Sequence, residues 1–189
     1  MTPAALTGGF VDAPLQSARA FRSILQAMAR PGTIHDLTGA LPPAPVSVAT
    51  GVALLTLADQ STPVYLAGAA DTPSVRDWLA FHLGAPLVGT EDAEFALGTW
   101  DDLQPVSRFR IGQPDYPDRS ATLIVAVDRL EPEGARLCGP GIRQAARLSL
   151  PGIDALQANA AMFPLGFDCL FTCGNRIAAL PRSIRLEVC

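Results

Sequence analysis

Apolar residues in the first third of the chain recur at the three- and four-residue spacing of an amphipathic helix. This spacing predicts a helix over Asp12–Arg30, with Asp12 as its N-cap, Pro14 in its first turn and Pro31-Gly32 as its stop. The next apolar run, Ala49–Asp59, is hydrophobic at almost every position. It predicts a helix buried on most sides, under a sheet or at a contact between subunits.

Strand patterns dominate the middle of the chain. A β-branched and aromatic run predicts a short strand at Thr62–Gly68, and a helix capped by Thr72 follows it over Thr72–Pro86. Longer runs predict three further strands, at Ala93–Trp100, Ser120–Leu130 and Gly134–Ile142. The second of these is continuous enough in apolar residues to lie in the middle of a sheet.

The last part of the chain combines a helix with a hairpin. The helix is predicted at Gly152–Phe163, and Gly174-Asn175 supplies a hairpin turn within Gly166–Val188. Pro181 breaks the second run, so Ser183–Cys189 is predicted as a short edge strand. Helices and strands interleave, partly through hairpins, which predicts an α/β fold with a mixed sheet in one domain over residues 1–189.

Composition narrows the function classes. The 189 residues are 49% hydrophobic and carry a formal net charge of −4, so a nucleic-acid partner is not expected. No apolar run has the length of a membrane span, and the N-terminus lacks the pattern of a signal peptide. We therefore expect a soluble, cytoplasmic protein.

The chain contains no lysine, and all 14 of its basic residues are arginine. Schiff-base chemistry needs a lysine amine, and a Walker-type phosphate loop ends in Lys-Ser/Thr. An enzyme that binds pyridoxal phosphate as an internal aldimine is thereby excluded. The four cysteines do not have zinc-ribbon or redox spacing and are predicted to be ordinary thiols: Cys138, Cys169, Cys173 and Cys189. With only two histidines, no metal site is predicted.

The segment "RLCGPGIRQAARL" carries the strongest candidate for anion binding. Pro140-Gly141 favours a type II turn, because proline presets φ and glycine accepts the positive φ that follows. Alternatively, Gly139 and Gly141 let backbone N–H groups approach an anion, with Arg143 or Arg147 on a following helix supplying charge. The sequence leaves both interpretations open.

Other polar residues also have two interpretations. His82 is either a capping or core histidine near a helix end or a general base. Arg182 and Arg185 face an anion, a partner chain or solvent on an edge strand. The acidic clusters 91–94 and 101–102 are explained by helix capping and solvation.

A resemblance covers the chain essentially end to end. It rests on seven blocks in the right order and spacing: "FRSILQAMARPG", "ATGVALLTLADQSTPVYL", "FHLGAPLV", "ATLIVAV", "LCGPGI", "FPLGFDCLFTCGNRIAALPRS" and the ending "EVC". In these blocks the chain resembles the H-subunit family of the bacterial carbon–phosphorus lyase complex.

The resemblance implies a three-layer α/β fold similar to that of pyridoxal-phosphate-dependent transferases, without the cofactor and paired as a homodimer. It also implies partners: the G, I and J subunits of a core complex, and the L protein. With G, I and L the family is linked to an early step of alkylphosphonate use. There the phosphonate displaces adenine from ATP and gives an α-D-ribose 1-alkylphosphonate 5-triphosphate.

The residues show no obvious nucleophile or base, and no catalytic residue is transferred from the family. We therefore expect an organising or accessory subunit whose partners hold the chemistry. If the chain contributes to binding phosphonate or ATP, five residues are the candidates: Gly139, Gly141, Arg143, His82 and Arg182. The alternatives are a stand-alone enzyme acting on a phosphorylated small molecule and a homodimeric scaffold.

Overall fold

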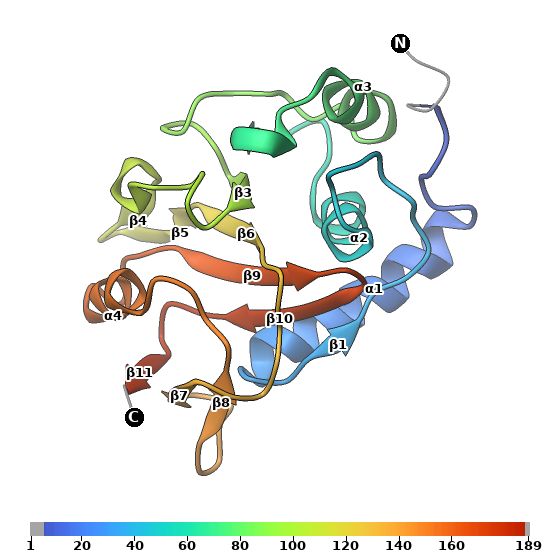
Figure 1. Cartoon of the computed structure of the whole chain (residues 1–189). Helices are drawn as coiled ribbons and strands as arrows, with labels where there is room; N and C mark the ends of the chain where they lie inside the picture. Colours follow the sequence, from blue (N-terminus) through green and yellow to red (C-terminus); the bar gives the residue numbers. More distant parts are fainter. Residues whose placement is uncertain (1–5, 188–189) are drawn as a thin grey trace.

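A six-stranded mixed sheet runs through the middle of the molecule, in the order β1-β10-β9-β6-β3-β2 (Figure 1). The structure is a computed structural model and describes residues 6–187. The strands of this sheet are β1 (His35–Asp36), β2 (Val64–Leu66), β3 (Phe95–Thr99), β6 (Thr122–Ala126), β9 (Asp168–Cys173) and β10 (Arg176–Leu180). Strands β2, β3, β6 and β9 are parallel, whereas β10 and β1 are antiparallel additions. The prediction of a mixed α/β fold is confirmed.

Three helices cover one face of the sheet: α1 (Ala13–Ala29), α2 (Val48–Leu57) and α3 (Pro73–His82). Their starts follow from local capping, since the Asp12, Ser47 and Thr72 side chains each accept a backbone N–H of the first turn. Helix α2 is the almost wholly apolar segment. It is buried within this layer against α1 and the sheet, so its apolar surface is covered inside the chain.

The opposite face is covered by helix α4 (Ile153–Ala161) and a small antiparallel sheet (Figure 1). The small sheet has the order β11-β7-β8, with β7 (Ala135–Cys138), β8 (Ala146–Leu148) and β11 (Arg185–Glu187). A separate hairpin joins β4 (Ile111–Gln113) to β5 (Tyr116–Ser120), and two 3₁₀ turns are η2 (Gly68–Ala70) and η3 (Val106–Arg108). Side chains alternate along the central strands, so each face contributes to its own apolar core.

Of two expectations about the segment after Gly134, the helix is wrong and the strand is confirmed with a shorter range. The arginines that follow the glycine turn are not on a helix, because Ala146–Leu148 pairs with Ala135–Leu137 as strand β8. The strand predicted over Gly134–Ile142 ends at Cys138 and lies in the small sheet. Cross-strand pairing decides both outcomes, and a short segment with mixed periodicity does not reveal it. The predicted edge strand is β11, and Cys189 lies outside the described residues.

Among residues 6–187, none of the helices has the length and apolar character to cross a membrane. The segments that sequence patterning did not detect are short: β1, β4, β5 and β8 have two to five residues each.

Candidate functional site

A crevice opens at the edge of the central sheet where its parallel strands end. Strands β3, β6 and β9 run in the same direction, so their last residues, Thr99, Ala126 and Cys173, lie at one edge. In open α/β sheets, ligands bind outside the carboxyl ends of the strands. The crevice has two lobes, and Thr99, Ala126, Val127 and Asp128 line both of them.

The larger lobe has a volume of about 780 Å³ and lies between the strand ends and the start of α4. Gly152, with φ +58°, lies under the Trp100 indole, and a Cβ there would be 2.1 Å from the ring. Arg129 forms an ion pair with Glu133 at the rim. Arg147 points one guanidinium nitrogen at a backbone carbonyl oxygen 3.1 Å away. This lobe is therefore lined by an aromatic ring, two arginines and three acidic residues: Asp101, Asp128 and Glu133.

The smaller lobe, about 260 Å³, lies over the start of α2. A chain of hydroxyls leads inward from it: Ser47 Oγ is 2.9 Å from Thr50 Oγ1, which is 2.7 Å from Thr172 Oγ1. The Thr172 hydroxyl donates to the Val125 carbonyl oxygen at 3.4 Å. The carbonyl oxygen only accepts, whereas in each of the two contacts between hydroxyls either oxygen is able to donate. The Thr50 N–H also donates to Ser47 Oγ.

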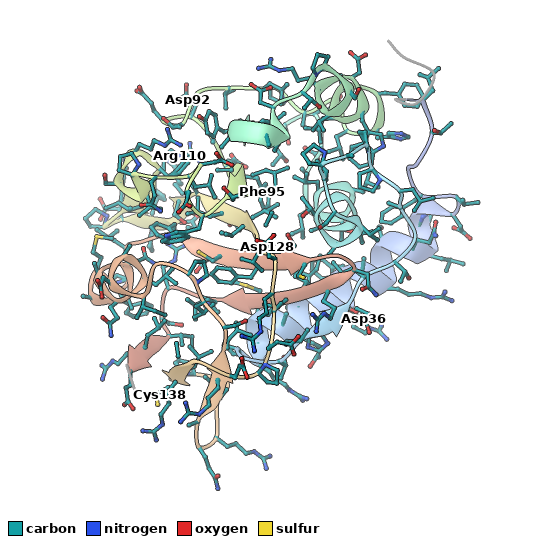
Figure 2. The ribbon with its side chains drawn as sticks, viewed as in Figure 1. Asp36, Asp92, Phe95, Arg110, Asp128 and Cys138 are labelled. Atoms are coloured by element: carbon teal, nitrogen blue, oxygen red, sulfur yellow. The ribbon has the colours of Figure 1, made fainter. Side chains whose placement is uncertain are left out.

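Two carboxylates complete the smaller lobe. The Thr99 hydroxyl donates to Asp102 at 2.7 Å and accepts the Asp102 N–H at 3.2 Å, which fixes that carboxylate at the end of β3. It rests against Gly68, where a Cβ would lie 2.1 Å from it. Asp128 follows β6 and is exposed (Figure 2). Within residues 6–187, its carboxylate has no hydrogen bond or ion pair.

The predicted glycine turn is present between β7 and β8. The Ile142 N–H donates to the Gly139 carbonyl oxygen at 3.2 Å, and Gly141 has φ +82°, as the third residue of a type II turn requires. The turn packs on the end of α1, since a Cβ at Gly141 would lie 2.1 Å from the Ala29 carbonyl oxygen. The turn is confirmed. Arg143, which follows it, is exposed.

His82 lies in the last turn of α3 and contacts the N-terminal segment. Its Nε2 is 3.2 Å from the Thr7 carbonyl oxygen. The imidazole packs beside the rings of Trp78 and Phe81, with centroids 5.1 and 4.9 Å away. These contacts give the ring a structural role in attaching the segment before α1 to α3.

Arg182 lies at the centre of a largely buried polar cluster after β10. Its guanidinium donates to both oxygens of Asp168, at 3.2 and 2.6 Å, to the Ser120 hydroxyl, and to the Pro117 carbonyl oxygen at 2.7 Å. The side chains of Arg182 and Asp168 are only 13% and 19% exposed. The cluster ties the end of β10 to the start of β9 and to β5.

The five predicted anion-binding residues thus lie in three separate places: Gly139, Gly141 and Arg143 in the β7–β8 connection, His82 in α3 and Arg182 after β10. None of them lines the crevice. Anion binding by any of them stays a prediction. Sequence reasoning had assigned Asp101 and Asp102 to capping and solvation, and it had not singled out Asp128.

Titratable groups outside the crevice add no second site. No group of three or more His, Cys, Asp or Glu side chains in residues 6–187 has the arrangement of a metal site. The described cysteines are free thiols. Burial, and next the charge of Asp168, raise the pKa of the Cys169 thiol, so it remains protonated and unreactive.

Residues 8–187 match the model of a protein family described as "Bacterial phosphonate metabolism protein (PhnH)". This chain belongs to the PhnH family.

Two relatives resemble it over nearly their whole lengths. One, from Rhizobium meliloti (strain 1021), is named "Alpha-D-ribose 1-methylphosphonate 5-triphosphate synthase subunit PhnH"; it is 39% identical, and the match covers 96% of this chain and 95% of the relative. The other, from Stutzerimonas stutzeri, is named "Putative C-P lyase subunit protein HtxG"; it is 32% identical, over 94% and 88% of the two chains. The resemblance found in the sequence is confirmed.

Membership of the PhnH family does not by itself locate the crevice. One local signal was available for Asp102, which follows the predicted strand Ala93–Trp100 by two residues. The predicted strand Ser120–Leu130 included Asp128, which in the structure follows the shorter β6. If those strands are parallel neighbours, their carboxyl ends share an edge and the two side chains line one crevice. The Ser47–Thr50–Thr172 chain had no such signal, because Thr50 and Thr172 are 122 positions apart.

Proposed function

We propose that this chain is a subunit of the assembly that makes α-D-ribose 1-alkylphosphonate 5-triphosphates during phosphonate breakdown. The observation that carries the proposal is the end-to-end match to the R. meliloti synthase subunit. The S. stutzeri relative, named as a subunit protein of a C-P lyase, supports the same assignment. The partners are the G, I and L proteins for this step and J for later cleavage of the carbon–phosphorus bond, all in the cytoplasm.

In the proposed reaction a phosphonate oxygen forms a bond to C1′ of the ATP ribose while the bond from C1′ to adenine breaks. Among the crevice residues there is no histidine, lysine or cysteine to act as an ordinary nucleophile or base. We therefore assign the chain an accessory role: it binds and orients, and a partner carries out the displacement. We also propose that its fold is related to that of pyridoxal-phosphate-dependent transferases and works without that cofactor, since the chain has no lysine for an aldimine.

Self-association and partner binding need an exposed apolar surface, and α1 provides one. Its outward face carries Leu15, Phe21 and Leu25, which are 57%, 51% and 50% exposed. Large apolar side chains gathered on one helix face are typical of subunit contacts. We propose that this α1 face, rather than the internally buried α2, forms the homodimer.

Co-purification tests the proposed assignment. A tagged copy of this chain is expressed in its own phosphate-starved cells growing on methylphosphonate, and the recovered proteins are identified by mass spectrometry. The G and I subunits should be recovered with it in fixed ratio. Recovery of the chain alone, with synthesis of the ribosyl phosphonate by the purified chain unaided, would support the stand-alone enzyme and refute the accessory role.

The homodimer is tested separately by size-exclusion chromatography with light scattering. Phe21→Asp should convert the dimer to a folded monomer, because it places a charge in the apolar contact. Met162→Asp is the matched control, since Met162 is 40% exposed at the end of α4 on the other face. A Phe21→Asp dimer as stable as the wild type would exclude the α1 face.

A further inference from the structure

Charged side chains of only one sign line the smaller lobe of the crevice. Its ionisable lining residues, Asp102 and Asp128, are both acidic. The Thr99 hydroxyl proton is used by Asp102, and the Ser47, Thr50 and Thr172 hydroxyls are hydrogen-bonded to one another. These hydrogen bonds leave the two carboxylates as the strongest acceptors beside the lobe.

The N-terminus of α2 lies beside the smaller lobe, but two of its N–H groups are already hydrogen-bonded. An N-terminus normally attracts anions through its unpaired N–H groups. In α2, however, the Ala49 N–H already donates to the Gly174 carbonyl oxygen at 2.9 Å, and the Thr50 N–H donates to Ser47 Oγ. The capping that starts the helix therefore uses donors that an anion would need.

A pocket lined by carboxylates favours a ligand that supplies hydrogen-bond donors. A phosphate, phosphonate or triphosphate group consists of acceptor oxygens with negative charge, so two carboxylates repel it. Sugar hydroxyls donate, and carboxylates outside the carboxyl ends of parallel strands bind ribose hydroxyls in nucleotide-binding α/β proteins. The lobe volume, about 260 Å³, suits one sugar ring better than a whole nucleotide.

We propose that the smaller lobe binds the ribose of a ribosyl substrate, with its vicinal hydroxyls donating to Asp128 and Asp102. This inference rests on the proposed function, which supplies a reaction at a ribose carbon. The ligand group assigned to the crevice is the ribose. The five residues predicted from the sequence were candidates for binding phosphonate or phosphate instead.

The larger lobe fixes the orientation of the ligand. It joins the smaller lobe through Thr99 and Asp128, and its lining includes Trp100, Arg147, Asp101 and the Arg129–Glu133 ion pair. Guanidinium groups suit phosphoryl oxygens. A ribosyl ligand with its hydroxyls in the smaller lobe therefore directs its charged end toward Arg147, which forms no ion pair within residues 6–187. Hydroxyl recognition and phosphoryl recognition are then separated within one crevice.

Ligand binding to the purified full-length chain tests this inference by isothermal calorimetry and by amide chemical shifts. Two probe pairs isolate the hydroxyls: adenosine against 2′,3′-dideoxyadenosine, and ribose 5-phosphate against inorganic phosphate. Adenosine and ribose 5-phosphate should each bind at least about tenfold more tightly than the other member of the pair. A site that recognises ribose hydroxyls loses hydrogen bonds to a ligand that lacks them. The shifts should concentrate on the ends of β3 and β6.

Asp128→Asn is the informative variant, since Asp128 is exposed and its replacement leaves the core intact. It should weaken ribose 5-phosphate binding about tenfold, because a charged acceptor is lost. Asp92→Asn is the matched control: Asp92 is another exposed aspartate, labelled in Figure 2, and it lines neither lobe. That variant should bind like the wild type.

Several results would overturn the inference. These are inorganic phosphate binding as tightly as ribose 5-phosphate, Asp128→Asn binding like the wild type, no ribosyl probe binding at all, or Mg²⁺ or spermidine alone producing the larger shifts at the same residues. Co-purification with the other subunits reports on the proposed function independently. A chain that enters the complex but binds no ribosyl probe would refute the ribose site and leave the subunit assignment in place.

Discussion

Replacing Arg182 with methionine tests whether this residue holds the fold together or is available to a ligand. The substitution keeps much of the side-chain volume and removes the guanidinium that bonds Asp168, Ser120 and the Pro117 carbonyl oxygen. Asp168 is then left as a carboxylate that is only 19% exposed and has lost its counter-charge. Breaking a buried ion pair from one side costs about 3–5 kcal/mol, and the partial exposure here favours the lower end, about 3 kcal/mol.

The assay is urea unfolding followed by circular dichroism and tryptophan fluorescence. With a denaturant dependence of about 2 kcal/mol per molar urea, the midpoint should fall by about 1.5 M. Arg185→Met is the matched control, because Arg185 is exposed on the edge strand β11, and its midpoint should stay near that of the wild type.

A double-mutant cycle tests whether Asp168 is the partner that makes Arg182 necessary. In the wild type the backbone N–H of Arg182 donates to Asp168 Oδ1 at 2.8 Å, and Asp168→Asn keeps an oxygen that can accept this bond. Combined with Arg182→Met it should cost less than the sum of the single changes, by about 2 kcal/mol, since no unpaired charge remains. A midpoint shift of less than about 0.3 M for Arg182→Met would refute the structural role and return Arg182 to the set of ligand-binding candidates.

Three further predictions concern stability alone. Gly141→Ala should cost about 3 kcal/mol or more in urea unfolding, because φ is +82° and the new Cβ meets a backbone carbonyl oxygen of α1; Gly174→Ala, with φ +60° and open space around it, should cost only about 1 kcal/mol. Equal costs would show that the turn does not pack on α1. Asn159→Ala should cost about 2–4 kcal/mol, because the buried amide bonds both the N–H and the carbonyl oxygen of Phe167; a loss below about 1 kcal/mol would contradict this. Hydrogen bonds from neighbouring hydroxyls and a backbone N–H lower the pKa of Asp59, so its contribution is complete above the ordinary pKa of 3.8 and is lost as the pH falls through the folded value. Asp59→Asn should therefore unfold with a shallower acid dependence below pH 3.8, and an unchanged acid profile would count against it.

Local features of the chain were predictable because local interactions decide them. The predicted N-caps Asp12 and Thr72 are N-caps in the structure, because a cap depends only on the residue itself and the three that follow it. Pro140-Gly141 forms the expected turn for the same reason. Strand β8 was not predictable, because its pairing with β7 outweighs the weak preference of three residues.

Sequence patterns were enough to predict the interleaved helices and strands, to exclude lysine chemistry and to identify the family to which the chain belongs. Which polar groups lie close together depends on how the elements pack. Parallel pairing brings Asp102 and Asp128 to one sheet edge, and helix packing places Ser47 beside them. The same packing surrounds Arg182 with acceptors and attaches His82 to the N-terminal segment. These are contacts between residues distant in the chain, and their energies depend on burial and register, which local patterns do not contain.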